Sequence, residues 1–229
     1  MAQTTAYPIL CPKCKAAQTV TLHDSLRVSV DPELRDALMA NELNKINCSC
    51  GHAFRVDKNF LYHDDRHGAM IYLVHAPLDQ ADAVEKGFLG TLQSLNQALP
   101  AGVKPPRVLL VLSRTELVER IFLVEAGLDE RVIEYVKYTI YTRNLKHIPF
   151  AAKVLLFDAQ GSTEENLHFV VQDAASHRLE SVVQFKRDTY QAIADAFNQD
   201  DKTGQLLELF PGPYISARRT LLAQDRKSR

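Results

Sequence analysis

The first 50 residues hold every cysteine of the 229-residue chain, and these cysteines fall into two close pairs. The pairs are Cys11-Pro-Lys-Cys14 and Cys48-Ser-Cys50-Gly51, with residues 15–47 as a spacer between them. Two short thiolate pairs joined by a spacer are a common way to build a tetrahedral Cys₄ zinc site, because each pair chelates the metal from a tight turn. We therefore predict that Cys11, Cys14, Cys48 and Cys50 bind Zn²⁺ together.

The two cysteine turns differ in length. In the first pair the proline fixes one φ angle, so that the backbone amides after Cys11 point at its sulfur and stabilise the thiolate. The second pair is one residue shorter and lacks the proline, although Gly51 tolerates the positive φ that can end such a turn. If the shorter turn does not reach the metal, His52 and His63 are the available substitutes for one sulfur.

A closed four-sulfur site leaves no coordination position for water, so it stabilises a fold and does not carry out hydrolysis. Free thiols or a redox disulfide are the alternatives to a bound metal.

The amino terminus lacks a charged segment followed by an apolar one, as a signal peptide would have, and no run approaches about 18 consecutive apolar residues. We expect a cytoplasmic protein without a membrane segment, and the reduced thiols of the cytosol favour metal over disulfides.

The composition is that of an ordinary globular protein, with 46% hydrophobic residues, 24% charged residues and a formal net charge of −1. Residues 1–75 contain equal numbers of Lys/Arg and Asp/Glu. Because nucleic-acid binding requires clustered cations that neutralise phosphates, we do not expect a nucleic-acid partner. We interpret the basic residues at the carboxyl terminus as a solvated tail: Arg218, Arg219, Arg226, Lys227 and Arg229.

A second group of side chains that could bind a metal or transfer protons lies in the segment Leu61-Tyr-His-Asp-Asp-Arg-His67. His63, Asp64, Asp65 and His67 could form a second metal site or an acid–base cluster. The alternative is a polar turn between two strands, in which Asp64 accepts hydrogen bonds from backbone amides. We favour the turn because the spacing matches no ligand signature that the chemistry of metals requires.

Tyr135, Tyr138 and Tyr141 recur at helical spacing beside Lys137 and Arg143. This strip could face a ligand or a partner, since tyrosine gives contact area at low entropic cost. Half-buried packing is the commoner role of such a stripe, and we favour it.

The chain contains no phosphate-binding glycine loop, no G-x-S-x-G elbow and no H-E-x-x-H helix. We therefore assign no catalytic residue.

The alternation of apolar residues predicts a β-rich zinc module over residues 1–76, built as a zinc ribbon with one inserted helix. The helix is expected to begin at Asp31-Pro32-Glu33, with Asp31 as the N-cap and Pro32 as the first helical residue. Such an insertion explains the long spacer between the cysteine pairs. The strands of this module are expected at residues 18–23, 26–30, 53–56 and 69–74.

Residues 77–229 are predicted to form a second domain, so the fold class is α+β. Ser113 and Glu116 match a capping box that opens a helix ending at Gly127, and Asp129 caps the next helix. We expect an irregular closing segment at residues 206–214. The other expected elements are helices at 79–99, 130–145 and 188–197, a buried strand at 108–112, and a small antiparallel sheet of strands at 153–157, 167–171 and 179–185.

Several short motifs occur in one order: Cys11-Pro-Lys-Cys14, Asp31-Pro-Glu-Leu34, Glu42-Leu-Asn44, Cys48-Ser-Cys50-Gly51 and Leu61-Tyr-His-Asp64. In order and approximate spacing they resemble the CpXC domain of bacteria and archaea. The resemblance implies a zinc-binding module of unassigned biochemical function, with the four cysteines as ligands and no catalytic residue. The chain departs from the family at the second knuckle, where the family usually has another Cys-Pro-x-Cys.

These observations lead to one main hypothesis and two alternatives. The main hypothesis is a non-enzymatic interaction or scaffold protein, with an unidentified protein partner and a structural Cys₄ zinc site. The first alternative is a redox-sensing zinc protein that releases its metal when the thiols are oxidised. The second is an enzyme or small-ligand-binding protein that uses the C-terminal domain. The oligomeric state does not follow from the sequence.

Overall fold

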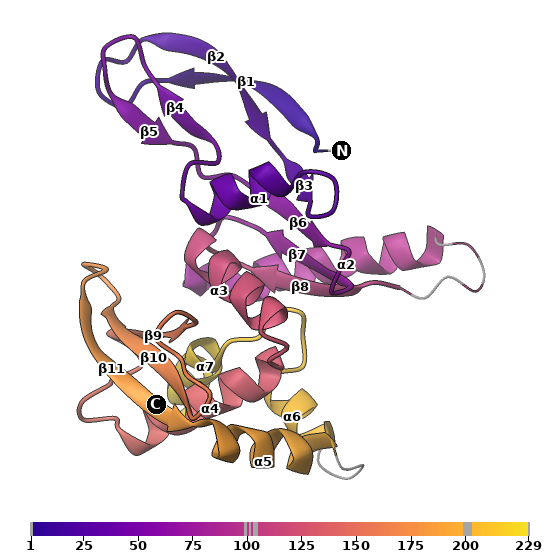
Figure 1. The fold of residues 1–229 in the computed structure, drawn as a ribbon, viewed down its shortest axis with the longest axis vertical. Coiled ribbons are helices and arrows are strands. Elements are labelled where there is room, and N and C mark those ends of the chain that lie inside the picture. Colours follow the sequence, from indigo (N-terminus) through magenta and orange to yellow (C-terminus); the bar gives the residue numbers. More distant parts are fainter. Residues whose placement is uncertain (1, 99, 101, 103–104, 199–202, 229) are drawn as a thin grey trace. The chain divides into compact units, whose positions relative to one another are not determined.

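The computed structural model describes residues 2–98, 100, 102, 105–198 and 203–228. It is an α+β protein, as predicted, and it divides into two compact units at residues 1–118 and 119–229 (Figure 1). We call them the N-terminal and C-terminal units. The predicted division after residue 76 differs from this one, because a later strand joins the sheet of the N-terminal unit. Whether residues 1–76 fold independently stays a prediction.

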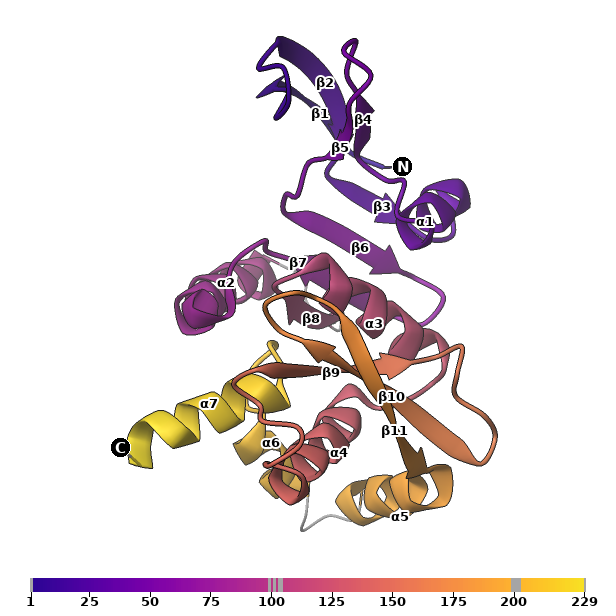
Figure 2. The same cartoon turned by 90° about the vertical axis from the view of Figure 1, so that its left-hand side faces the viewer.

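Two antiparallel hairpins, which we call the ribbon, lie side by side in the N-terminal unit (Figures 1 and 2). One pairs β1 with β2 and the other pairs β4 with β5. A short strand and a helix separate them in the chain, which confirms the predicted insertion. The ribbon and its insertion comprise β1 (Thr4–Leu10), β2 (Ala17–His23), β3 (Ser25–Arg27), α1 (Pro32–Met39), β4 (Lys45–Asn47) and β5 (Ala53–Arg55).

The inserted helix begins at the predicted residues, but the Asp31 side chain makes a different hydrogen bond from the one expected of an N-cap. Asp31 is the N-cap residue and Pro32 opens the helix, yet the Asp31 side chain makes no capping hydrogen bond. Its Oδ2 instead accepts a hydrogen bond from the backbone N–H of Arg27 at 3.2 Å. This turn ends β3 at Arg27, so the strand predicted over residues 26–30 is shorter than expected.

A four-stranded sheet completes the N-terminal unit, in the order β3-β6-β7-β8. β6 (Phe60–Asp64) and β7 (Ala69–Leu73) form an antiparallel pair, and their residues alternate between buried and half-buried positions. β8 (Arg107–Val111) pairs with β7 in parallel. A parallel pair needs a long crossover, which η1 (Leu78–Gln80) and α2 (Ala81–Ala98) supply. Residue 99 of the predicted helix lies outside the described residues.

The predicted capping box lies at the start of α3 (Arg114–Glu125), a helix that crosses the boundary between the units. The Oγ of Ser113 accepts a hydrogen bond from the N–H of Glu116 at 3.2 Å, as predicted. The Glu116 carboxylate accepts from the N–H of Leu112 at 2.8 Å, one residue before the position that a standard box uses. The helix then ends near Gly127, whose φ of 64° closes it.

In the C-terminal unit, a three-stranded antiparallel sheet of order β11-β10-β9 is accompanied by helices, and the predicted sheet is thereby confirmed. Asp129 caps α4 as expected, since its Oδ1 accepts from the N–H groups of Arg131 and Val132. The elements are α4 (Glu130–Arg143), β9 (Lys153–Asp158), β10 (Asn166–Asp173), β11 (Leu179–Lys186), α5 (Arg187–Asn198), α6 (Thr203–Leu209) and α7 (Ala217–Ser228).

Two predictions for the carboxyl-terminal part are wrong in part. Residues 206–209 of the segment 206–214, predicted as irregular, belong to helix α6, whereas residues 210–214 are irregular as predicted. Of the residues interpreted as a solvated tail, Arg218, Arg219, Arg226 and Lys227 lie in α7, which buries Ala217 and Leu221, and residue 229 lies outside the described residues. Arg218 also donates from Nε to the carbonyl of Phe150 at 2.8 Å. A helix as short as α6 or as polar as α7 is marginal by itself, so tertiary contacts decide whether it forms.

Four charged side chains form a buried network in the C-terminal unit: Glu119, Arg120, Glu134 and Lys137. Lys137 Nζ lies 2.6 Å from Glu119 Oε1 and 2.8 Å from Glu134 Oε1. Arg120 Nη2 lies 3.0 Å from the same Glu134 oxygen. Burial opposes the ionisation of Glu134, but the two cations outweigh it and lower the pKa of this carboxyl group.

None of the described helices is long and apolar enough to cross a membrane.

Candidate metal centre

The predicted metal ligands lie in the two turns of the ribbon. Cys11 and Cys14 occupy the turn that joins β1 to β2, and Cys48 and Cys50 occupy the turn that joins β4 to β5. The strands beside each turn are held in antiparallel register, with Leu10 opposite Ala17 in the first hairpin. Each pair of sulfurs is therefore fixed by a hairpin, which is a local consequence of the β-forming residues around it.

The first turn is closed by two backbone hydrogen bonds within residues 11–16. The N–H of Cys11 donates to the carbonyl of Ala16 at 3.0 Å, and the N–H of Lys15 donates to the carbonyl of Cys11 at 2.9 Å. Lys15 follows the second cysteine and has a φ of 61°. This left-handed residue turns the chain back into β2.

The second turn repeats this pattern with one residue fewer. The N–H of Cys48 donates to the carbonyl of His52 at 3.0 Å, and the N–H of Gly51 donates to the carbonyl of Cys48 at 2.9 Å. Gly51, again the residue after the second cysteine, has a φ of 80°. The missing residue is thus absorbed by a tighter turn, in which glycine adopts the left-handed conformation at no steric cost.

The ligand atoms of all four cysteines lie within 4.8 Å of one another. Two of the short sulfur–sulfur distances join different turns: Cys11 and Cys50 are 3.8 Å apart, and Cys14 and Cys48 are 3.6 Å apart. A tetrahedron with Zn–S bonds of about 2.3 Å has sulfur–sulfur edges of about 3.8 Å. The cluster therefore has dimensions that can hold a metal ion, and the sulfurs are too far apart for disulfides.

Burial and backbone donors distinguish the four thiols. Cys11 and Cys48 are buried, whereas Cys14 and Cys50 are exposed. Hydrogen bonds from the backbone N–H of Cys14, and to a lesser extent from that of Lys13, lower the pKa of Cys11 to about 6. The amide of His52 acts in the same direction on Cys50. Although Cys50 is exposed as a residue, the partial desolvation of its sulfur and the three neighbouring sulfurs outweigh this hydrogen bond and raise its pKa to about 12. The amides that follow Cys11 thus favour its thiolate, as the sequence predicts.

The two histidines named as substitute ligands lie elsewhere. The His52 ring stacks on Phe54 with a centroid distance of 5.9 Å. His63 lies in β6, opposite Met70 of β7. Within residues 2–98, 100, 102, 105–198 and 203–228, the four cysteines are the only group of three or more potential ligands that is close enough to hold a metal ion.

The polar segment that follows β6 is a turn, as we favoured. The Oδ1 of Asp64 accepts from the backbone N–H groups of Arg66 and His67 at 3.0 and 3.1 Å. Its Oδ2 lies 2.8 Å from Nδ1 of His67. Asp65 turns away to bind Ser29 and Arg27. These carboxylates hold the backbone together and form no second metal cluster among the described residues.

The tyrosine strip of α4 packs within the C-terminal unit. Tyr141 is buried, accepts from the N–H of Leu155 at 2.8 Å and donates to the carbonyl of Lys153 at 3.1 Å. Tyr135 contacts Phe197 edge to face, with ring centroids 5.0 Å apart. The hydroxyl of Tyr138 donates to Gln224 of α7 at 3.1 Å. The structure thus supports packing for these tyrosines, as favoured from the sequence.

The fold and the cysteine cluster define an α+β protein with one four-thiol site that can hold a metal ion. The model of the CpXC protein family matches residues 9–137, which is more than half of the chain. The chain therefore belongs to the CpXC family, and the matched segment includes both cysteine turns. Comparisons with curated proteins and with solved structures gave no match.

Proposed function

We propose that the cluster binds one Zn²⁺ through Cys11, Cys14, Cys48 and Cys50. The observation that carries this proposal is the convergence of four sulfurs, at tetrahedral spacing, from two separate turns. An all-thiolate tetrahedral set favours zinc or iron over harder cations. Elemental analysis of the full-length protein as purified tests the assignment. We expect one zinc per chain, and iron with visible absorption would contradict it.

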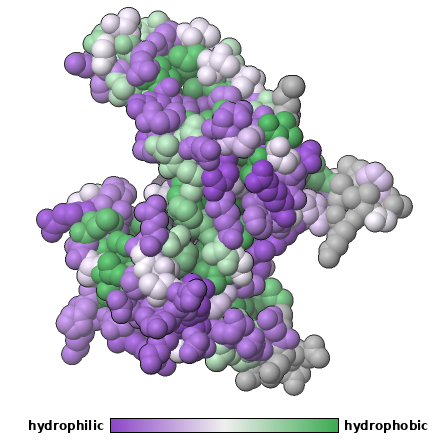
Figure 3. Space-filling view, in the orientation of Figure 1, coloured by the Kyte–Doolittle hydropathy of each residue, from purple (hydrophilic) through white to green (hydrophobic). Residues whose placement is uncertain are grey.

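We propose a structural role for this zinc, because the ribbon has little else to stabilise it. Its four strands bury only two side chains, Leu22 and Ile46. On the face shown in Figure 3, hydrophilic and hydrophobic residues are mixed over the ribbon, with no continuous apolar covering. A small β module without its own core depends on metal, and metal binding then supplies folding free energy.

We further propose that the whole chain acts as an interaction or scaffold protein for a protein partner. A closed Cys₄ site offers no coordination position for a substrate, and the ribbon displays exposed strands of the kind that partners use. Affinity purification of the tagged chain from its host, in parallel with a Cys14→Ser variant, tests this role. A partner retained by the native chain and lost by the variant supports it; equal recovery by both contradicts a role for the ribbon.

One observation favours redox sensing as a second candidate function. Cys14 and Cys50 are exposed, so an oxidant can reach one sulfur in each turn. Oxidation of either thiolate would remove a ligand and release the metal. Zinc release under mild peroxide, followed with a chromogenic chelator, separates the two candidates. Stoichiometric release that thiol reductant reverses supports the sensor, and zinc retention supports the purely structural site.

A further inference from the structure

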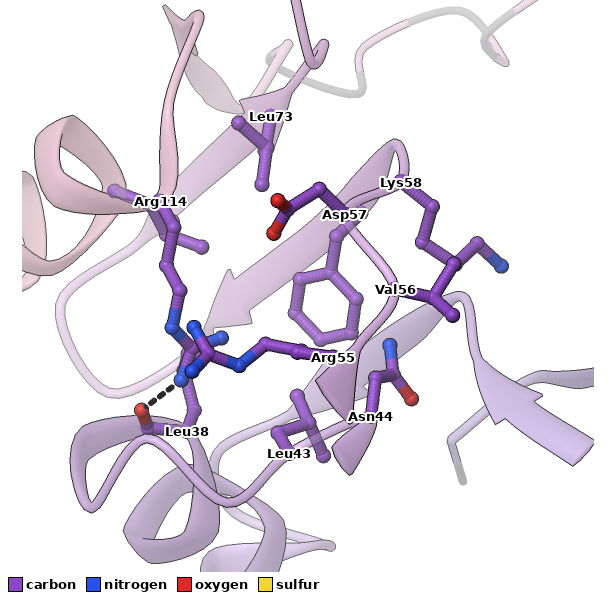
Figure 4. Close-up of a pocket in the computed structure, with 11 residues that line it drawn as sticks. Leu38, Leu43, Asn44, Arg55, Val56, Asp57, Lys58, Leu73 and Arg114 are labelled. Carbon is purple, nitrogen blue, oxygen red and sulfur yellow. Dashed lines mark hydrogen bonds between the residues drawn. The ribbon is translucent and has the colours of Figure 1, made fainter. Parts of the chain in front are cut away.

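A small cavity in the N-terminal unit lies away from the cysteines, between β5, the end of α1 and the start of α3 (Figure 4). Its walls are largely apolar, from Leu38, Leu43 and Leu73. Two arginines that are 59 positions apart in the chain also line it, Arg55 and Arg114. In Figure 4 their guanidinium groups converge beside Leu38. Two cations at one cavity require an explanation, because like charges repel more strongly where water is scarce.

Arg114 is held in a fixed orientation toward this cavity. Its Nη2 donates to the carbonyl of Leu38, and its Nε donates to the side-chain oxygen of Asn41 at 2.9 Å. These contacts engage two of its five N–H groups. Burial lowers the pKa of Arg114, and the charge of Arg55 lowers it further, so the two guanidinium groups interact electrostatically.

Arg55 has no comparable anchor. Its Nε is buried from solvent and has no hydrogen-bond acceptor among the described residues. Buried donors are normally paired, and an unpaired one is destabilising because it has lost its bond to water. Arg55 is the last residue of β5, and its side chain is half-buried.

The other charged residues of the cavity do not neutralise this pair. Asp57 is exposed, and its carboxylate points toward Leu73 rather than toward the two guanidinium groups (Figure 4). It raises the pKa of Arg114 only as the last of three influences. Lys58 is engaged elsewhere, since its ammonium group bonds to Asp24 and to the hydroxyl of Tyr7. The cavity thus has an excess of positive charge.

We propose that this cavity binds the oxyanion head of a small ligand, a phosphate or carboxylate group held between Arg55 and Arg114. Guanidinium groups present parallel N–H donors that match the oxygens of such anions. The bound anion would accept the unpaired Nε–H of Arg55 and would relieve the repulsion between the two cations. The limited size of the cavity selects a single anionic group and excludes a polyanionic chain. This site is independent of the metal and of the proposed scaffold role.

Titration of the full-length, metal-loaded protein with inorganic phosphate tests the site, at constant ionic strength set with sodium chloride. We expect phosphate to raise the melting temperature and to shift the backbone amide signals of Leu38, Asn44 and Arg55. Arg55→Gln removes the positive charge and the parallel N–H donors of the guanidinium group. It removes no hydrogen bond that the fold uses. We expect this variant to fold and to weaken phosphate binding about tenfold or more, as loss of a charge-assisted bond does.

Arg66→Gln is the matched control, because Arg66 is exposed on a turn of the same unit and has no part in the cavity. It should bind phosphate like the native chain. A parallel titration with acetate distinguishes a carboxylate ligand from a phosphate ligand. The proposal is overturned if neither anion shifts the cavity signals, or if Arg55→Gln binds the anion as tightly as Arg66→Gln does.

Discussion

The ribbon and the C-terminal unit stabilise their structures by different means. The ribbon strands bury Leu22 and Ile46, and the turns add the buried Cys11 and Cys48. The C-terminal unit instead buries a stripe on α4 and alternate residues of β9 and β10: Val132, Ile133, Val136, Ile140, Leu155, Phe157, Leu167, Phe169 and Val171. Half of the buried side chains of the ribbon are thus thiols that can bind a metal.

The buried charged side chains of the C-terminal unit connect segments that are distant in the chain. In the ribbon, the four sulfurs bring distant segments together in a similar way. Glu134 accepts from the N–H of Ala217 at 2.8 Å, and Glu119 accepts from the N–H of Phe157 at 2.5 Å. Arg120 donates to the carbonyl of Ile215 at 2.5 Å. These cross-links are built from the chain alone, so we expect this unit to fold without metal.

The largest expected effect is the loss of the ribbon when one of the proposed metal ligands is removed. Binding free energies of structural zinc sites are on the order of 10 kcal/mol, more than so few buried side chains can replace. In Cys14→Ser we expect the amide signals of β1, β2, β4 and β5 to collapse to unfolded positions, while those of α4 and β9–β11 stay unchanged. Heteronuclear NMR of the full chain measures both sets.

The control for this variant is Ser49→Ala, which changes an exposed residue of the second turn that is not a ligand. It should retain the native spectrum. A wild-type-like melting curve and spectrum for Cys14→Ser would contradict the structural role of the metal.

The next effect concerns the buried network of the other unit. Lys137→Met leaves the buried carboxylates of Glu119 and Glu134 without their shared cation. Breaking a buried charge pair in this way costs about 3–5 kcal/mol. Urea denaturation followed by circular dichroism should show this loss, and Lys146→Met, at an exposed position, should show none. Equal midpoints for the two variants would mean that the network contributes little.

A smaller effect is expected at the start of α4. Asp129→Ala removes the acceptor of two helix N–H groups, from Arg131 and Val132. Loss of such a cap costs about 1 kcal/mol. Urea denaturation of the C-terminal unit measures it, with the exposed Asp195→Ala as the comparison. A chelator should not change the difference between these two variants, because the proposed metal site lies in the other unit.

The smallest effect is a pH dependence in the C-terminal unit. The pKa of Asp173 is lowered by the N–H of Ser176 and then by the ammonium group of Lys153. A lowered pKa stabilises the fold above the unfolded value, here 3.8, and this contribution is lost as the pH falls below it. We expect Lys153→Met to raise the pKa of Asp173, as carbon-13 NMR of its carboxyl group can show. An unchanged titration would exclude the ion pair as a cause.

The local parts of this structure follow from the sequence. The cysteine turns, the Ser113 and Asp129 caps and the end of α3 near Gly127 depend on residues within a few positions of each other, so spacing alone predicts them. The shortened knuckle also follows locally, because glycine at position 51 permits the tighter turn. The sequence did not determine whether both Cys48 and Cys50 reach the cluster, and the structure shows that they do.

The non-local parts do not follow from the sequence. The apolar run of β8 predicts a buried strand, but nothing in it specifies parallel pairing with β7 and hence membership of the N-terminal unit. Helix α6 is short and helix α7 is polar, so their contacts with α4 determine whether they form. Arg55 and Arg114 meet only because β5 and α3 converge, and no spacing rule relates them.

X-ray absorption spectroscopy at the zinc edge, on the full chain as purified, tests the central claim most directly. The account predicts one zinc per chain with four sulfur neighbours at about 2.3 Å. A first shell that contains nitrogen or oxygen would show that one cysteine, for instance in the shortened Cys48-Ser-Cys50 turn, is not a ligand. A chain without zinc and with a folded ribbon would contradict the claim altogether.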